Sequence, residues 1–193
     1  MFIGNNDLSI EIVQNPTIPH FTNIYQENVA TTTNGINIEI FDDFTCKNCT
    51  NFATNALLKI KELEKKSKNI NVTLYFTPDT TNELYYKSAL SLKCAADQKT
   101  FWDMHAQLHQ NKNKLNTDTF LKIAKELELE EDQFTNCMTE DLYKNKIRED
   151  FEYANGKNIK IKPTIIINNY RLIGSQPFEN IEYVVNKIQK SKS

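Results

Sequence analysis

Two cysteines separated by two residues, Cys46 and Cys49, lie between a strand-like segment and a helix-like segment. Before them, residues 35–41 alternate isoleucine with polar residues, which is typical of a strand with one buried face. After them, apolar residues recur at steps of three and four up to position 63, which predicts one continuous amphipathic helix. Residues 70–76 predict a second strand, so the cysteine pair opens the helix of a strand–helix–strand unit with a right-handed crossover.

The remainder of the chain predicts helices first and strands again near its end. Helical patterns occur at about 83–98, 100–110, 117–127, 132–138 and 140–154, with Thr117 or Asp118 as an N-cap and Asn155-Gly156 as a stop. Residues 164–167 and 170–173 flank Asn168-Asn169 and predict a tight hairpin, followed by a last helix. The predicted α/β order gives one domain from residues 35–80 and 158–193, an inserted helical domain at 81–157, and an N-terminal extension at 1–34.

Charge and hydropathy argue against two classes of protein. The net charge is −2, which leaves no basic surface for phosphates, so we expect no nucleic-acid partner. No run of 18 apolar residues occurs, so we expect no membrane-spanning helix. Residues 1–15 lack a basic region followed by an apolar stretch, so no signal peptide is evident. A cytosolic protein and a mature chain whose leader has been removed both fit this observation.

A C-x-x-C pair occurs in zinc sites and in redox dithiols. A zinc site with four ligands usually needs a second close pair, whereas Cys94 and Cys137 are isolated in the sequence. His105 and His109 are four residues apart, but Ala106 follows the first, so the metalloprotease pattern H-E-x-x-H is absent. We therefore expect no metal and favour the redox interpretation.

The redox interpretation assigns different roles to the two cysteines. A Cys46 thiolate at the start of a helix is stabilised by free backbone N–H groups and by the positive end of the helix dipole. Lys47 adds a nearby cation. Both effects are expected to lower the pKa of the Cys46 thiol. Cys49 falls on the apolar stripe of the helix, so we expect it to be buried and to resolve the mixed disulfide that forms at Cys46.

Three motifs carry a family resemblance, which covers about residues 35–190. They are the strand–CxxC–helix unit, residues 162–164 (KPT) with residues 174–178 (GSQPF), and residues 94–105 (CAADQKTFWDMH). In this order they resemble the thioredoxin superfamily, and the helical segment is similar to that of bacterial DsbA-type oxidoreductases. The resemblance implies a thioredoxin-like fold with an inserted all-helical subdomain, and thiol:disulfide oxidoreductase activity with oxidation as the expected direction.

The resemblance also implies roles for single residues. Cys46 would be the nucleophile, Cys49 the resolving cysteine, and Pro163 a cis-proline facing the site, in a loop that offers backbone groups to an extended substrate peptide. Lys162 stands where the family usually has valine or threonine; its ammonium either stabilises the Cys46 thiolate or extends to solvent. The dipeptide Lys47-Asn48 differs from the Pro-His of the family's type member, so redox strength and substrate preference are expected to differ.

A second cysteine pair and two acids complete the candidate residues. Some relatives carry a structural disulfide at positions similar to Cys94 and Cys137, which would close a loop of about 44 residues and contribute about 4 kcal/mol. Two buried free thiols are the alternative. Of the acids before the cysteine pair, Asp42 and Asp43, we take Asp43 as a modulating residue that helps proton transfer; a solvated loop acid is the alternative.

The resemblance implies partners and a location as well. Substrates would be reduced cysteine-containing secreted proteins, re-oxidation would come from a DsbB-like membrane oxidase, and no cofactor is expected beyond the redox-active disulfide. The location would be periplasmic or secreted, with the signal peptide absent from this chain. A monomer is favoured over an oligomer formed through residues 1–34. Two alternatives stay open: a reductase or isomerase of the same fold, and a non-catalytic thioredoxin-like binding module.

Overall fold

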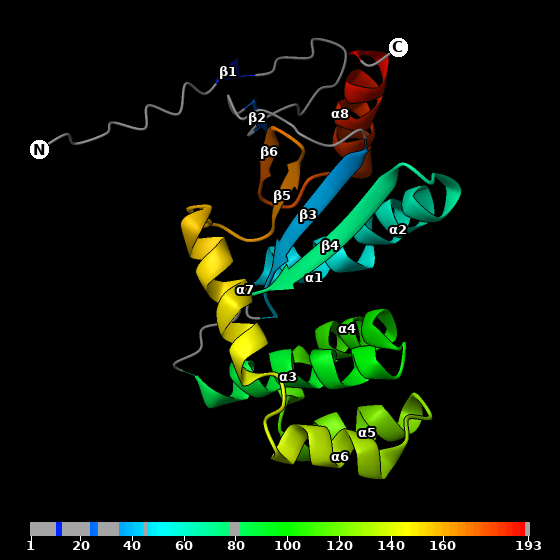
Figure 1. Cartoon of the computed structure of the whole chain (residues 1–193), viewed down its shortest axis with the longest axis vertical. Helices are drawn as coiled ribbons and strands as arrows, with labels where there is room; N and C mark the ends of the chain where they lie inside the picture. The colour runs from blue at the N-terminus through cyan, green and yellow to red at the C-terminus, as the bar shows by residue number, and fades with distance from the viewer. Residues whose placement is uncertain (1–10, 13–23, 27–34, 45, 78–81, 192–193) are drawn as a thin grey trace, which may run out of the picture.

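The computed structural model describes residues 11–12, 24–26, 35–44, 46–77 and 82–191, which form a mixed sheet flanked by helices (Figure 1). The six strands follow the spatial order β1-β2-β6-β5-β3-β4. The strands are β1 (Glu11–Ile12), β2 (Ile24–Gln26), β3 (Ile36–Asp42), β4 (Ile70–Phe76), β5 (Thr164–Ile167) and β6 (Tyr170–Ile173). The helices are α1 (Lys47–Thr54), α2 (Ala56–Lys66), α3 (Glu83–Asp97), α4 (Phe101–Gln110), α5 (Thr117–Glu126), α6 (Glu131–Thr139), α7 (Lys144–Gly156) and α8 (Phe178–Ser191), with a short 3-10 turn, η1 (Lys112–Lys114).

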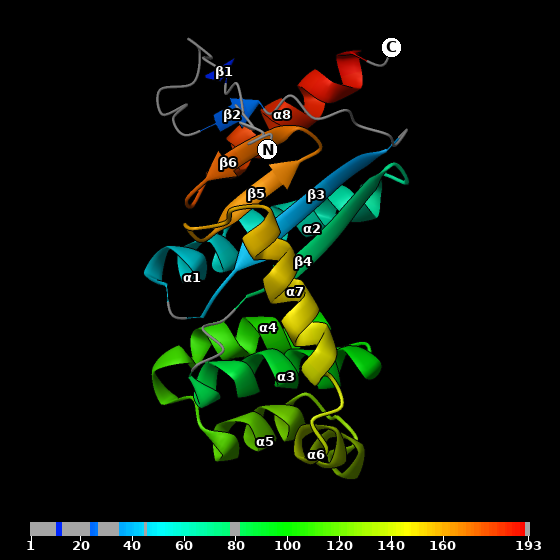
Figure 2. The same cartoon turned by 60° about the vertical axis from the view of Figure 1, so that its left-hand side comes forward.

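Strand β3 lies inside the sheet, between β5 and the edge strand β4, and most of its residues are buried. It pairs in parallel with β4, as the strand–helix–strand pattern predicted, and it also pairs antiparallel with β5, which the sequence did not predict. Ile38 and Ile40 belong to the core cluster that includes apolar residues of α1, α2 and α8. Phe41 points to the opposite face and packs with Ala154 of α7 and Ile166. The sheet therefore lies between α1, α2 and α8 on one face and α7 on the other (Figure 2).

The helices between β4 and β5 lie mostly beyond one end of the sheet. Figures 1 and 2 show α3, α4, α5 and α6 stacked there, while α7 runs back along the sheet. The predicted α/β class with helices inserted between strands is confirmed, whereas the domain limits at residues 81 and 157 stay a prediction. Most of residues 1–34 lie outside the described residues. Within those that the structure describes, every helix is too short or too polar to cross a membrane.

The predicted single helix after the cysteine pair is wrong, because a break at Asn55 separates α1 from α2. Asn55 has φ −125° and ψ −83°, which no helix accommodates. Its side-chain amide donates to the carbonyl oxygen of Asn51 at 2.8 Å, so a side chain takes an acceptor of the helix backbone. Phe52 and Leu57 on either side of the break both face the core, which is why the apolar periodicity does not reveal it.

The predicted start of α5 is also wrong by one or two residues. The N-cap is Asn116, whose side-chain oxygen accepts a hydrogen bond from the Thr119 backbone N–H at 2.8 Å. Thr117 and Asp118 lie inside the first turn instead. Any of the three residue types can cap a helix, so composition alone does not select among neighbouring positions.

Two chain reversals depend on asparagine. The predicted hairpin is confirmed, and Asn168 in its turn has φ +52°. Helix α7 continues through Gly156, and the left-handed residue after it is Asn158, with φ +54°. The helix thus ends later than the predicted stop at Asn155-Gly156. Asparagine tolerates the left-handed region better than most residues with a side chain, so it substitutes for glycine in this glycine-poor chain.

Candidate functional site

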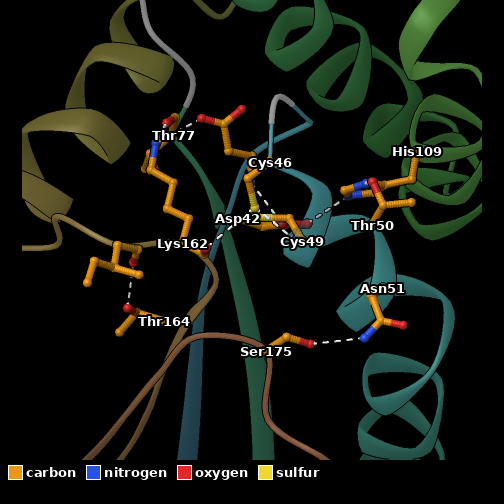
Figure 3. The surroundings of a disulfide bond; sticks show 12 residues. Asp42, Cys46, Cys49, Thr50, Asn51, Thr77, His109, Lys162, Thr164 and Ser175 are labelled. Atoms are coloured by element: carbon orange, nitrogen blue, oxygen red, sulfur yellow. Dashed lines mark hydrogen bonds and ion pairs between the residues drawn. A yellow bond between two sulfur atoms is a disulfide. The ribbon is translucent and has the colours of Figure 1, made fainter. Parts of the chain in front are cut away.

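Cys46 and Cys49 form a disulfide at the start of α1, with Cα atoms 5.3 Å apart (Figure 3). Cys46 is the N-cap residue, and its sulfur accepts a hydrogen bond from the Cys49 backbone N–H at 2.9 Å. Cys46 is partly exposed, whereas Cys49 is 0% exposed on the apolar face of the helix. An incoming thiolate can therefore reach the sulfur of Cys46 but not that of Cys49.

The loop before β5 lies against this disulfide. The peptide bond between Lys162 and Pro163 is cis, and the carbonyl oxygen of Lys162 is 3.4 Å from the Cys46 sulfur. The Pro163 carbonyl accepts a hydrogen bond from the Gly174 backbone N–H at 2.8 Å, where Gly174 has φ +83°. The structure thus brings the CxxC segment, the proline loop and the start of the β6–α8 connection together.

The side chain of Lys162 points away from the disulfide. Its ammonium forms an ion pair with Asp43 at 3.2 Å and donates a hydrogen bond to the Thr77 carbonyl oxygen. The expectations from sequence were contact with the Cys46 thiolate or extension into solvent, and the structure shows a partner that neither included. Asp43 is the acid of this ion pair, and its role in proton transfer stays a prediction. Lys47 and Asn48 are both exposed beside the disulfide.

This ion pair leads to a prediction for the thiol. Asp43→Asn leaves the Lys162 ammonium without its carboxylate, so we expect the pKa of the Cys46 thiol in the reduced protein to fall, by less than about one unit. Lys162→Met removes the cation and leaves the carboxylate, so the pKa is expected to rise. Thiolate absorbance against pH measures both values. Equal pKa values in the wild type and both variants would show that this ion pair does not influence the cysteine.

A buried cluster of one acid and two histidines lies next to the cysteine segment. Asp42, the last residue of β3, is 0% exposed, and its Oδ2 is 2.7 Å from Nε2 of His105 and 2.9 Å from Nε2 of His109. Both histidines belong to α4 and are buried. The other carboxylate oxygen, Oδ1, accepts the Asp43 backbone N–H at 2.8 Å. Both oxygens of the Asp42 carboxylate therefore take part in hydrogen bonds.

Burial and hydrogen bonding act in opposite directions on the ionisation of this cluster. Burial raises the pKa of Asp42, but hydrogen bonds and charge interactions with His105 and His109 outweigh it and lower that pKa to about 2. Burial also lowers the pKa of His105 below its ordinary 6.5, although Asp42 acts against this. At neutral pH the cluster therefore contains a carboxylate and a neutral His105.

The cluster is connected to the helix that carries the disulfide. Nδ1 of His109 is 3.3 Å from the hydroxyl of Thr50, the residue after Cys49 (Figure 3). The ring of Phe44, two residues before Cys46, packs on the His109 ring with centroids 4.5 Å apart. Sequence reasoning compared the histidines only with the metalloprotease pattern. Their i, i+4 spacing on one helix face was the signal that could have paired them with a strand-end acid.

The cluster also predicts how stability depends on pH. The lowered pKa of Asp42 contributes about 2 kcal/mol above pH 3.8, and this contribution is lost as pH falls towards 2. His105 resists protonation in the fold, so its contribution begins to fall once pH drops below 6.5. We expect Asp42→Asn to be less stable than wild type at pH 7, with the difference shrinking in acid. Urea unfolding at a series of pH values measures this; a constant difference would contradict it.

Cys94 and Cys137 form a second disulfide, between α3 and α6, with Cα atoms 5.8 Å apart. Both residues are buried in the core of the helical layer. All four cysteines of the chain are therefore in disulfides, and the alternative arrangement of two free thiols is not what the structure shows. This disulfide is remote in sequence from the Cys46–Cys49 pair. It crosslinks two helices, whereas the Cys46–Cys49 disulfide lies at the start of a single helix.

One family model matches most of the chain and shows the family to which it belongs. A family model described as thioredoxin matches residues 34–187, which includes the cysteine pair, the inserted helices and the proline loop. The chain belongs to this thioredoxin family. The disulfide at the start of α1 and the cis-proline loop beside it both lie within the matched residues.

Solved structures show which branch of the fold the chain resembles. The thiol-disulfide exchange protein α-DsbA2 of Wolbachia pipientis superposes with a TM-score of 0.69 and 18% identity, covering 82% of this chain and 85% of that protein. Oxidoreductase DsbA of Xylella fastidiosa has a TM-score of 0.64 and 15% identity, covering 81% and 87%. At such identities the likeness concerns the fold, which confirms the predicted DsbA-type arrangement with inserted helices.

Curated relatives are longer proteins. A Na+/H+ antiporter, NhaA 1 of Salinispora arenicola, is 27% identical over 146 residues, which are 75% of this chain and 22% of that protein. NhaA 3 of Salinispora tropica is 25% identical over the same share of each. The chain thus spans about a fifth of the length of the curated relatives that it matches.

Proposed function

We propose that this chain works as an oxidase that introduces disulfides into other proteins. The observation that carries the proposal is the asymmetric disulfide: Cys46 is partly exposed and caps α1, whereas Cys49 is fully buried. A sulfur at a helix N-cap is more stable as a thiolate, which favours the reduced enzyme and so makes the oxidised enzyme a stronger oxidant.

The exchange proceeds in two balanced steps. A substrate thiolate attacks the sulfur of Cys46, which breaks the bond to Cys49 and forms a mixed disulfide; the released Cys49 sulfur takes up a proton. The substrate's second thiolate then attacks its own sulfur in the mixed disulfide. This step leaves the substrate with an internal disulfide and releases Cys46 as a thiolate. The substrate loses two electrons and the enzyme gains them.

The stabilisation of the leaving Cys46 thiolate comes mainly from the backbone. The Cys49 N–H already points at the Cys46 sulfur at 2.9 Å in the disulfide, so the donor is in place before reduction. The Lys162 ammonium is offset by Asp43, and Lys47 is exposed to solvent, so both lysines contribute less than their charges suggest. Helix α1 is therefore the main source of oxidising strength in this proposal.

The substrates of this oxidase would be reduced, cysteine-containing secreted proteins. The Lys162–Pro163 loop lies next to Cys46, and this position supports an extended peptide as the bound segment, because a peptide can add to a protein as an extra strand through its backbone groups. A DsbB-like membrane oxidase would restore the disulfide, and the redox-active disulfide would be the only cofactor. A periplasmic or secreted location follows from this proposal, since disulfides persist in oxidising compartments.

The reduction potential of the Cys46–Cys49 pair tests the direction. The pair is equilibrated with glutathione, and Cys46→Ala serves as the control that cannot form the disulfide. A value near about −120 mV, as in strong oxidants, would support an oxidase, whereas a value near about −270 mV would indicate a reductase. Dimerisation together with an intermediate potential would favour an isomerase. Failure to oxidise a dithiol peptide at all would leave the chain as a binding module.

A further inference from the structure

The cluster of Asp42, His105 and His109 takes no part in the exchange steps described above, and its geometry suits another ligand. Three potential metal ligands, one carboxylate oxygen and two imidazole nitrogens, lie within 4.8 Å of one another and come from two different elements. They are side chains of residues that are 0%, 2% and 1% exposed. Together they are a two-histidine, one-carboxylate set, a combination used by catalytic zinc and iron sites.

The geometry points to a binding site for one divalent transition-metal ion, such as Zn²⁺, held by Asp42 Oδ2 and by Nε2 of His105 and His109. The two histidines stand at i, i+4 on α4, the spacing by which one helix face presents two ligands to a zinc ion. The absence of a glutamate after His105 excludes the protease pattern but not this ligand set. The third ligand was not visible from sequence because Asp42 lies 63 positions before His105.

The charge of the cluster favours a cation. Among the described residues, the Asp42 carboxylate has the two imidazoles and the Asp43 N–H as its hydrogen-bond partners, and no lysine or arginine contacts it. The Asp42 side chain is 0% exposed, and a carboxylate held away from water is costly unless positive charge or hydrogen bonds compensate it. When the ion binds, the proton on Nε2 of each ring moves to Nδ1, and the ion places positive charge beside the carboxylate.

The groups around the cluster fit the ligand roles. The Asp43 N–H occupies Oδ1 of Asp42, which leaves Oδ2 for a monodentate bond. Metal binding at Nε2 of His109 moves the ring proton to Nδ1, and the Thr50 hydroxyl at 3.3 Å can accept that proton as readily as it donates in the other tautomer. Such partners on the second ring nitrogen orient histidine ligands in metal sites.

Each ring must move away from Asp42 Oδ2 to admit the ion, and the two ring nitrogens lie within 4.8 Å of each other. Zinc bonds of about 2.0 to 2.2 Å in tetrahedral geometry place neighbouring ligand atoms about 3.3 Å apart. The distances here are 2.7 and 2.9 Å, so each ring must move by about half an ångström. Three protein ligands leave a fourth position, as in zinc sites that are open to another ligand.

Fully oxidised protein gives a clear test, because all four cysteines are then in disulfides and no thiolate competes for the metal. We expect oxidised protein to bind one equivalent of Zn²⁺ in a calorimetric titration. In ¹⁵N NMR spectra, we expect the signals of His105 and His109 to show that their Nε2 atoms no longer carry a proton after zinc has bound. Absence of binding, or binding that leaves both resonances unchanged, would overturn the proposal.

Matched variants separate this site from binding at the third histidine of the chain, His20. The chain has three histidines, so His109→Gln and His20→Gln make the same chemical change inside and outside the cluster. We expect His109→Gln to lose zinc binding and His20→Gln to retain it. Thr50→Val is expected to weaken binding by about tenfold, since it removes only the orienting hydroxyl. Equal affinity in wild type and His109→Gln would reject the site; if His109→Gln does not fold, the wild-type NMR result decides alone.

Discussion

Cys46→Ala is expected to reduce thiol–disulfide exchange to the uncatalysed rate. The remaining cysteine of the pair, Cys49, is 0% exposed and lies on the apolar face of α1, so no substrate thiolate reaches it. The loss concerns the chemical step and not folding, because a disulfide that closes so short a loop restricts the unfolded chain little. The effect is measured as the rate at which a dithiol peptide is oxidised, monitored by the decrease in its free thiols.

The matched control is Cys49→Ala, which keeps the reactive sulfur and removes the resolving one. Starting from reduced variant and a disulfide-containing peptide, Cys46 is expected to form a mixed disulfide that persists. Mass spectrometry under non-reducing conditions detects this covalent complex. Substantial turnover by Cys46→Ala, or the absence of any trapped complex with Cys49→Ala, would contradict the assignment of the two roles.

Removing the second disulfide is expected to have the largest effect on stability. The double variant Cys94→Ala/Cys137→Ala opens a crosslink with a sequence separation of 43, which corresponds to a loss of about 4 kcal/mol in the free energy of unfolding. This is a large share of the total of about 5 to 15 kcal/mol for an ordinary domain. Guanidinium unfolding monitored by fluorescence of the single tryptophan, Trp102, measures the change.

The same double variant should keep the reduction potential of the Cys46–Cys49 pair. The bridge joins α3 to α6 in the helical layer, whereas the reactive pair opens α1 beside the sheet. Wild type treated with mild reductant until only the Cys46–Cys49 pair is reduced provides the control for loss of the reactive disulfide alone. An unfolding free energy within about 1 kcal/mol of wild type would show that the crosslink contributes little to stability.

The sequence predicted the parts of this fold that depend on local patterns. Alternating isoleucines located β3, and Asn168-Asn169 located the hairpin between β5 and β6. Local patterns did not predict the break at Asn55, because the apolar stripe of α1 continues into α2 across it. The break depends on a side-chain hydrogen bond to Asn51, which hydrophobic periodicity does not report.

For the site, the cysteine pair and the proline loop were predicted from the sequence, but the ionic contacts around them were not. Lys162 and Asp43 are 119 positions apart, so their ion pair depends on how β5 is placed beside β3. Asp42 and His105 meet only because α4 packs next to the end of β3. Motif spacing describes neighbours along the chain, whereas these partners are set by the packing of separate elements.

The order of the elements along the chain also has a consequence for biosynthesis. Cys46 and Lys162, whose atoms touch in the site, are 116 positions apart. At about 5 to 20 residues per second, the ribosome delivers the loop roughly 6 to 23 seconds after the cysteine pair. During that interval β3 can pair with β4, but its other edge awaits β5. The nascent chain therefore has its cysteine pair before the Lys162–Pro163 loop that contacts it. The site is complete only when β5 and β6 have been synthesised.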